Sequence, residues 1–164
     1  MSVTFNADEV LRMAEQIERN GAIFYREAAG KTGNTEIKDM FLNMAAMEDE
    51  HMKTFEEMRK DLAAQEKEQT VFDPYDEAAL YLQTMADDKG SEGMKSPTEK
   101  LTGNESPTEL LNIAISAEKN SVLFYVGLKD LVGAKAGQDK IDAIIREEVK
   151  HVADLRRTLT ALSA

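Results

Sequence analysis

The stretch NADEVLRMAEQIERNGAIFY, residues 6–25, has a counterpart in SPTELLNIAISAEKNSVLFY, residues 106–125. Further along, EDEH at 48–51 and EVKH at 148–151 are separated by the same 100 positions. One offset for both pairs indicates a duplicated unit of two helices. Two copies are too few for a solenoid, but they are enough to form one symmetric site where they meet. Identical pairs at this offset include Glu9/Glu109, Leu11/Leu111, Ala14/Ala114, Glu18/Glu118, Asn20/Asn120, Phe24/Phe124, Tyr25/Tyr125, Asp39/Asp139, Glu48/Glu148 and His51/His151.

Capping and turn residues divide each copy into two helices. The first helix is expected to stop at Gly30, as a C-terminal cap, and Gly33 opens the second. In the second copy, Ser106 can cap a helix, Pro107 suits its first position, and Glu109 completes a capping box. The four helices are predicted over 7–29, 35–66, 107–132 and 137–162.

The prolines mark the connection between the copies. All three lie between residues 74 and 107, with long proline-free stretches on either side. We expect the connection over about 69–105, with a short helix over 76–86 and a polar surface loop after it. Short breaks make each helix pair an antiparallel hairpin, and a connection this long can run the length of a bundle. The sequence therefore predicts an all-α fold: one domain, 1–164, that is a four-helix bundle with a long crossover.

The composition excludes several kinds of site and partner. The chain has no Cys, which excludes disulfides, Cys-ligated zinc, iron–sulfur clusters and redox thiols. A net charge of −11 opposes binding to nucleic acid or to anionic membranes. No apolar stretch is long enough to span a bilayer, and the first residues lack a signal-peptide pattern. We therefore expect a cytoplasmic protein with no nucleic-acid or membrane partner.

Each predicted helix carries an apolar stripe that is interrupted near its middle by Glu, or by Glu and His. Four buried carboxylates facing one another would repel and take up protons. Two divalent cations would neutralise them, and the two histidines of the chain would serve as neutral nitrogen ligands. Residues three apart lie on one face of a helix, so the Glu and His of each Glu-x-x-His motif can reach one ion. The predicted metal ligands are Glu18, Glu48, His51, Glu118, Glu148 and His151.

Residues near these ligands have more than one interpretation. Tyr25 and Tyr125 follow a predicted Glu ligand by two helical turns, so they either hydrogen-bond the ligand carboxylates, as candidate catalytic side chains, or are core aromatics. Gly21 and Ser121 either open a pocket for a small oxidant or permit close helix packing. Glu147 is expected to face solvent rather than to bind metal.

These motifs together resemble the rubrerythrin and ferritin-like superfamily, and the resemblance covers nearly everything except the connection. It implies a ferritin-like bundle with a di-iron centre, in which two helices give one Glu each and two give Glu-x-x-His. Glu and His also suit Mn and in some sites Zn, so the metal stays open. The resemblance further implies a homo-oligomer, a dimer or larger. The motifs that carry the resemblance are Glu18…Tyr25, Glu48-Asp-Glu-His51, Glu118…Tyr125 and Glu148-Val-Lys-His151.

The sequence departs from this superfamily in two ways. Rubrerythrins usually carry a further Glu three residues after the ligand of the third helix, where this chain has Ser121. Rubrerythrins often carry a Cys-rich rubredoxin module, and a chain without Cys needs an external electron donor such as a rubredoxin or a reductase. The six-ligand set is instead similar to that of bacterioferritin, but the Met that binds haem there is Asp49 here, so we expect no haem.

Three functions remain open at this point. The first is an enzyme that reduces hydrogen peroxide or dioxygen at a di-iron centre. The second is a ferroxidase that handles or stores iron. The third is a bundle that a metal merely stabilises, without turnover.

Overall fold

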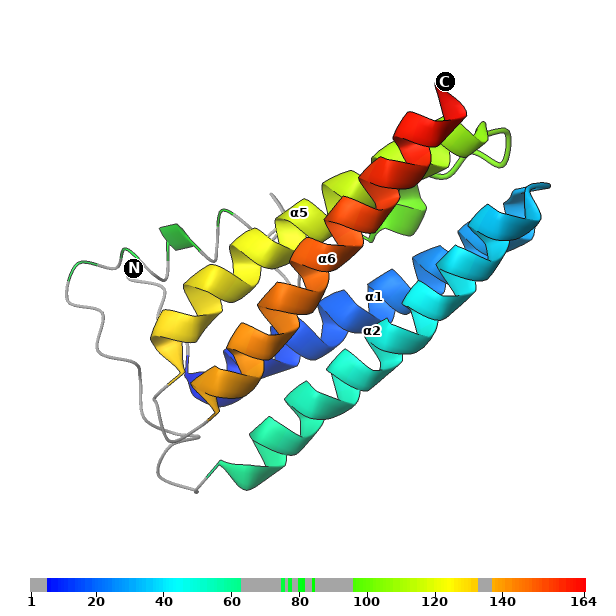
Figure 1. The fold of residues 1–164 in the computed structure, drawn as a ribbon. Coiled ribbons are helices and arrows are strands. Elements are labelled where there is room, and N and C mark those ends of the chain that lie inside the picture. The colour runs from blue at the N-terminus through cyan, green and yellow to red at the C-terminus, as the bar shows by residue number, and fades with distance from the viewer. Residues whose placement is uncertain are drawn as a thin grey trace.

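The computed structural model describes residues 6–62, 96–132 and 137–164, together with positions 75, 77, 80, 81 and 84. Its regular structure is helical, and no described helix is both long and apolar enough to cross a membrane. The all-α fold predicted from the sequence is confirmed (Figure 1). The elements are α1 (Ala7–Lys31), α2 (Thr35–Asp61), the short 3-10 helix η1 (Pro97–Lys100), α5 (Pro107–Leu131) and α6 (Gln138–Leu162).

The starts of α1 and α5 show that the duplication extends to the helix caps. The Asn6 side chain accepts a hydrogen bond from the Glu9 amide at 2.9 Å, and the Glu9 carboxylate accepts one from the Asn6 amide at 2.9 Å. Ser106 and Glu109 form the same reciprocal pair, at 3.2 and 2.7 Å. Each cap of this kind contributes about 1 kcal/mol to helix stability. Matching caps therefore begin the first helix of both copies at equivalent positions.

Two helix ends differ from their approximate predicted positions. The first helix passes through Gly30 and ends at Lys31, because the Thr32 amide still donates to the Ala28 carbonyl and closes the last turn. The helix expected over 35–66 ends at Asp61, because Leu62 takes an extended backbone and buries its side chain in the core. Positions 63–66 lie outside the described residues.

The connection between the hairpins is described only in part. Of the short helix expected over 76–86, positions 77, 80, 81 and 84 are described and are helical, and the others lie outside the described residues. The surface loop expected after it is interrupted by η1, which contacts both α1 and α5. Ser96 caps η1 and Pro97 occupies its first turn, which is a helix-start signal inside a polar segment.

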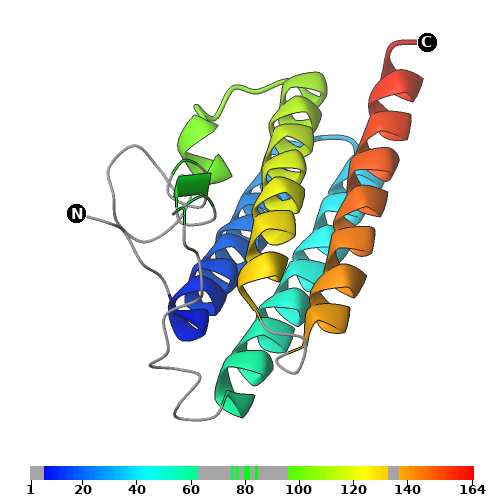
Figure 2. The ribbon, with the colours of Figure 1, turned by 90° about the vertical axis from the view of Figure 1, so that its left-hand side faces the viewer.

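The four long helices form two antiparallel hairpins, α1 with α2 and α5 with α6 (Figures 1 and 2). The helix α2 ends at one end of the bundle, and α5 begins at the opposite end (Figure 1). The chain between Asp61 and Pro107 therefore joins opposite ends of the bundle, as the predicted crossover requires.

The described residues form two separate apolar clusters in the core, one toward each end of the bundle. Along every long helix, the residues of one cluster are separated from those of the other by a buried polar position. A layer of ionisable side chains thus crosses the middle of the bundle. The first cluster includes Leu11, Phe55, Leu128 and Ile141, and the second includes Ala28, Phe41, Leu111 and Leu155.

Candidate metal centre

The polar layer contains all six predicted ligands. The helices α1 and α5 contribute one Glu each, and α2 and α6 contribute a Glu and a His each, spaced three apart so that both face the interior. All six side chains are at most 5 % exposed. Six ionisable groups buried in a 164-residue chain need partners to offset the cost of their desolvation. They are Glu18, Glu48, His51, Glu118, Glu148 and His151.

The donor atoms fall into two overlapping groups that could each hold a metal ion. Glu18 and His51 complete one group, and Glu118 and His151 complete the other, while Glu48 and Glu148 belong to both. Within each group the donor atoms lie within 4.8 Å of one another. Ligands on opposite sides of an ion bound at about 2.1 Å are about 4.2 Å apart. The groups are therefore of a size to hold two ions, with the two shared carboxylates between them.

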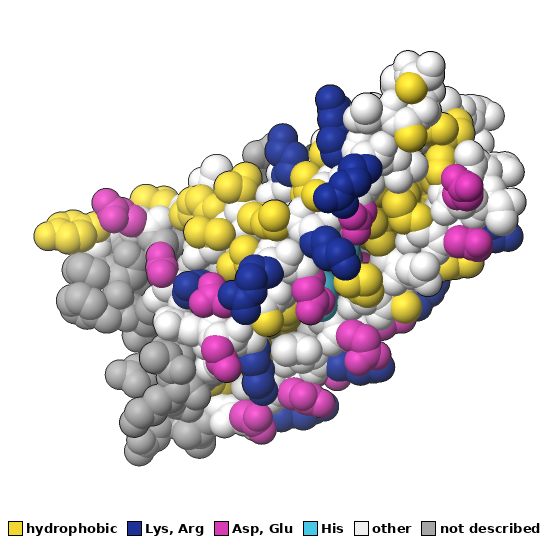
Figure 3. All heavy atoms as spheres, in the orientation of Figure 1, with side chains coloured by type: hydrophobic (Ala, Val, Ile, Leu, Met, Phe, Trp, Pro, Cys, Tyr) yellow, Lys and Arg dark blue, Asp and Glu magenta, His cyan; other side chains and the backbone are white. Residues whose placement is uncertain are grey.

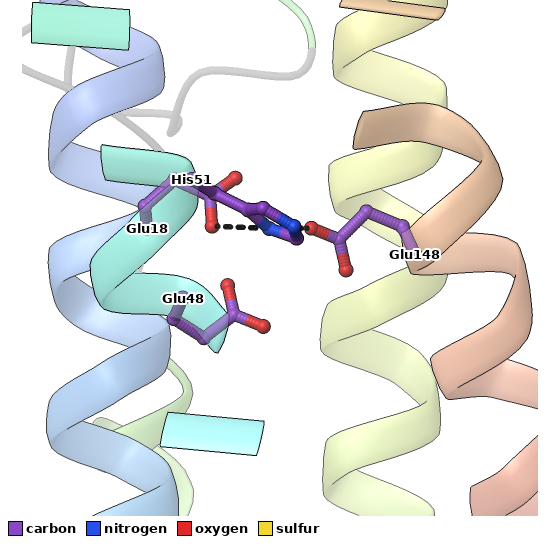
Figure 4. Close-up of side chains that lie close together, drawn as sticks. All are labelled: Glu18, Glu48, His51 and Glu148. Atoms are coloured by element: carbon purple, nitrogen blue, oxygen red, sulfur yellow. Dashed lines mark ion pairs between the residues drawn. The ribbon is translucent and has the colours of Figure 1, made fainter. Parts of the chain in front are cut away.

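The histidines turn the same ring nitrogen inward. The Nδ1 atom of His51 lies 2.8 Å from Glu148 Oε1 and 3.4 Å from Glu18 Oε2 (Figure 4). The Nδ1 atom of His151 lies 3.0 Å from Glu148 Oε2 and 3.5 Å from Glu118 Oε1. The two rings are nearly parallel, with centroids 6.0 Å apart. Each imidazole thus presents one nitrogen to the carboxylates, and Glu148 faces both.

The electrostatics show that the layer without metal retains protons. Burial, followed by repulsion from Glu148, raises the pKa of Glu118 to about 8, and the same causes raise the pKa of Glu48 well above its usual range. Burial lowers the pKa values of His51 and His151, but close polar contacts of the imidazoles with neighbouring carboxylates outweigh burial and raise the two values to about 11 and about 10. Burial likewise opposes the charged form of Glu148, yet its close contacts with both histidines leave its pKa lowered. Cations entering the layer would have to displace these protons.

Unsatisfied atoms support a cation site. Glu18 Oε2, Glu48 Oε1, His51 Nδ1 and Glu148 Oε1 are buried and make no well-aligned hydrogen bond. The close approach of His51 Nδ1 to Glu148 Oε1 is an ion-pair contact without that alignment. A buried polar atom without a partner costs roughly 1–3 kcal/mol. Four such atoms in one layer fit divalent cations, which would satisfy them all once the protons were displaced, better than a purely structural core.

The two tyrosines bond to the carboxylates across the bundle. The Tyr25 hydroxyl of α1 donates to Glu118 of α5, and the Tyr125 hydroxyl of α5 donates to Glu18 of α1. Burial, and then the nearby carboxylates, raise the pKa of both phenols well above 10, so both remain donors. Both aromatic rings are also packed in the apolar clusters. Each tyrosine is therefore both a hydrogen-bond donor to a predicted ligand and a core aromatic, and its catalytic role stays a prediction.

A small cavity adjoins the layer between α1 and α5. It offers about 50 Å³ to water-sized molecules and is lined by Gly21, Ser121, Glu48 and Glu118, with Pro97 of η1 at its side. One water needs roughly 10–15 Å³ by this measure, so the cavity can hold a molecule as small as peroxide. A Cβ atom at Gly21 would lie 3.2 Å from Glu48 Oε2, closer than most such contacts. Gly21 thus leaves room for the cavity and also lets Glu48 pack closely against α1.

Two polar contacts near the layer escaped the sequence analysis. Glu147 faces solvent as expected, yet its Oε2 atom lies 2.7 Å from Nε2 of His51. Glu15 is a further buried carboxylate, but the Arg59 guanidinium pairs with it at 2.5 Å. The offset of 100 shows which residues correspond between the copies, but it does not show which side chains of neighbouring helices meet. Only the packing of α2 against α6 and of α1 against α2 reveals these pairs.

Fold and site together define a ferritin-like carboxylate protein. The rubrerythrin family model matches residues 9–159, and the chain belongs to that family. It is also similar to a crystal structure from Thermotoga maritima that is described as a ferritin-like diiron-carboxylate protein. The two share 27 % identity over 96 % of each chain, with a TM-score of 0.75. No match was found among curated proteins. The resemblance stated from the motifs is confirmed.

Proposed function

We propose that the chain holds two iron ions in this layer and reduces hydrogen peroxide or dioxygen with electrons from an external donor. The observation that carries the proposal is the pair of donor groups that share Glu48 and Glu148 beside a small cavity. Bound as Fe²⁺, two ions would supply the two electrons that convert one peroxide and two protons into two waters. Membership of the rubrerythrin family supports iron as the metal.

The chain's own residues would position the metals and admit the oxidant. Glu48 and Glu118 line both the layer and the cavity, so a small molecule in the cavity lies next to ligand carboxylates. The apolar clusters above and below the layer limit the water that surrounds it. Tyr25 and Tyr125 fix the carboxylates that each belong to one donor group only. These contacts keep the ligands in place while the charge of the centre changes.

The electron donor is proposed to be a separate protein. The sequence has no Cys and hence no rubredoxin-type iron site. We therefore expect the oxidised centre to accept electrons from an added rubredoxin or reductase, and we expect the protein to act as a homo-oligomer.

Rapid mixing of the anaerobic, Fe²⁺-loaded protein with each oxidant tests the proposal. We expect faster oxidation by hydrogen peroxide than by dioxygen, and repeated turnover only when an electron donor is supplied. The control variant Glu57→Gln removes an exposed carboxylate outside the centre and should react as the wild type does. Fe²⁺-loaded protein that reacts with neither oxidant would contradict the proposal.

One observation favours a second function, iron oxidation and storage. Ser121 stands where rubrerythrins usually carry a further Glu, and its hydroxyl donates to the Ala117 carbonyl at 3.2 Å. Without that further Glu, the six predicted ligands form the set of ferritin-like di-metal carboxylate proteins, and this set resembles that of bacterioferritin. Faster oxidation by dioxygen, with iron accumulating beyond two ions per chain, would support this second function.

A further inference from the structure

The outer nitrogens of the two histidines have unlike partners, although the copies match in every predicted ligand. The Nε2 atom of His51 lies 2.7 Å from the Glu147 carboxylate. The Nε2 atom of His151 instead faces the Met47 sulfur at 3.4 Å. Glu147 and Met47 are counterparts at the offset of 100, and each immediately precedes a shared carboxylate. The six predicted ligands are therefore symmetric between the copies, but the partners of the outer histidine nitrogens are not.

These partners differ in what they do to an imidazole. A carboxylate accepts a strong hydrogen bond from Nε2–H, so it fixes the tautomer that leaves Nδ1 free to bind a metal, and it increases the basicity of that nitrogen. A thioether is only a weak acceptor. In metalloproteins, loss of such an outer carboxylate typically costs roughly 10- to 100-fold in metal affinity. The Glu147 side chain is 51 % exposed, so the lower end of that range applies.

The pair lies at the edge of the layer rather than deep within it. His51 is 4 % exposed, and Glu147 reaches its ring from α6. On the face drawn in Figure 3, a histidine edge is visible beside an acidic side chain, among mixed acidic and basic residues. A substitution at Glu147 can therefore change this contact without opening the core.

We propose that Glu147 is a positioning residue that makes the two metal positions unequal. The position formed with Glu18 and His51 binds a divalent ion first, and the position formed with Glu118 and His151 binds second. The inference rests on the proposed metal centre, because it ranks two positions that the centre must contain. It assigns to Glu147 a role that its solvent exposure alone would hide.

Imidazole nitrogen NMR during Zn²⁺ titration tests the ranking without any turnover. The chain has only two histidines, so the spectrum of protein with ¹⁵N-labelled histidine contains two ring systems, and His151→Gln assigns them. We expect the first equivalent of Zn²⁺ to shift the His51 Nδ1 signal, with a dissociation constant roughly tenfold lower than at His151. Glu147→Met should abolish the difference, and the double exchange Met47→Glu/Glu147→Met should reverse the order.

Two controls separate the possible failures. Glu147→Gln keeps an acceptor but loses the charge, so it should retain part of the ranking, and Glu57→Met removes an exposed carboxylate elsewhere and should retain all of it. Equal occupancy of both positions in the wild type, earlier occupancy at His151, or a ranking unchanged by Glu147→Met would overturn the inference while leaving two bound ions. Histidine signals that never respond to Zn²⁺ would overturn the metal centre itself.

Discussion

The hairpin of α1 and α2 and the hairpin of α5 and α6 begin with the same capping box and bring equivalent Glu and His residues into one layer. Outside that layer they differ. The first hairpin contains the partly buried ion pair of Glu15 with Arg59, and the equivalent positions of the second hairpin hold Ile115 and Leu159. An apolar pair can thus replace an ion pair in the same scaffold. Matching chemistry is thus kept in the caps and in the layer, but not at every buried position of the two copies.

Removing the metal from both positions together should have the largest effect on the stability of the fold. A ligand that binds only the folded state at 1,000 times its Kd stabilises that state by roughly 4 kcal/mol. For a chain of this length this corresponds to about 8–16 °C in Tm for each position. We expect a chelator to lower the Tm of the loaded protein by at least that amount at pH 8, measured by calorimetry.

The loss on chelation should be smaller at pH 5 than at pH 8. The pKa of Glu118 is raised to about 8 in the folded protein. The metal-free fold therefore loses stability as the pH rises from the ordinary pKa of a Glu in the unfolded chain toward 8. The pKa values of His51 and His151 are raised to about 11 and about 10, so their contribution is complete below about 6.5 and declines as pH rises above it. Both effects make the metal-free protein more stable at pH 5. A Tm indifferent to chelator at both pH values would contradict the account.

Removing one histidine should weaken metal binding at one of the two positions and leave the other occupied. We expect His51→Ala to weaken the position shared with Glu18, and His151→Ala to weaken the position shared with Glu118, each by at least about 100-fold. Each variant should retain close to one metal ion per chain, as measured by elemental analysis after gel filtration. If both variants still carry the wild-type metal content, the histidines are ordinary core residues.

The sequence predicted the helices and the ligand layer, but not every helix end or every contact between neighbouring helices. Helical periodicity places Glu48 and His51 on one face, and the offset of 100 places Glu148 and His151 at the matching level, so the layer follows from the sequence alone. Periodicity does not show which side chain of a neighbouring helix meets a given residue, which is why the contact of Glu147 was missed. The end of α2 was missed for a related reason, because it depends on the burial of Leu62 in the core.

Breaking the ion pair that distinguishes the first hairpin should have a moderate effect. Arg59→Ala leaves the buried Glu15 without its partner, which we expect to destabilise the fold by about 2 kcal/mol. The double variant Glu15→Ile/Arg59→Leu, which copies the second hairpin, should recover most of that loss, because apolar replacement of a buried pair is often neutral. Urea unfolding measures both. If the double variant were less stable than Arg59→Ala, the halves would not be interchangeable here.

The smallest changes in stability and metal binding are expected from substitutions of the small residues Gly21 and Ser121. Gly21→Ala should raise the stability of the metal-free protein by up to about 1 kcal/mol, because Ala favours a helix interior. The same substitution should weaken metal binding by less than about tenfold, because the new Cβ presses on Glu48, which belongs to both donor groups. Ser121→Ala is the matched control and should leave both quantities nearly unchanged. Thermal unfolding of metal-free protein and competition with a chelator would measure them; tighter metal binding by Gly21→Ala would contradict the packing argument.

The central claim is that one duplicated layer holds two metal ions. Anomalous X-ray diffraction at the iron edge, from crystals of protein loaded anaerobically with Fe²⁺, tests it most directly. The account predicts two iron peaks per chain, one bonded to Nδ1 of His51 and the other to Nδ1 of His151, with Glu48 and Glu148 contacting both. A single peak, or no peak among the six residues, would contradict it.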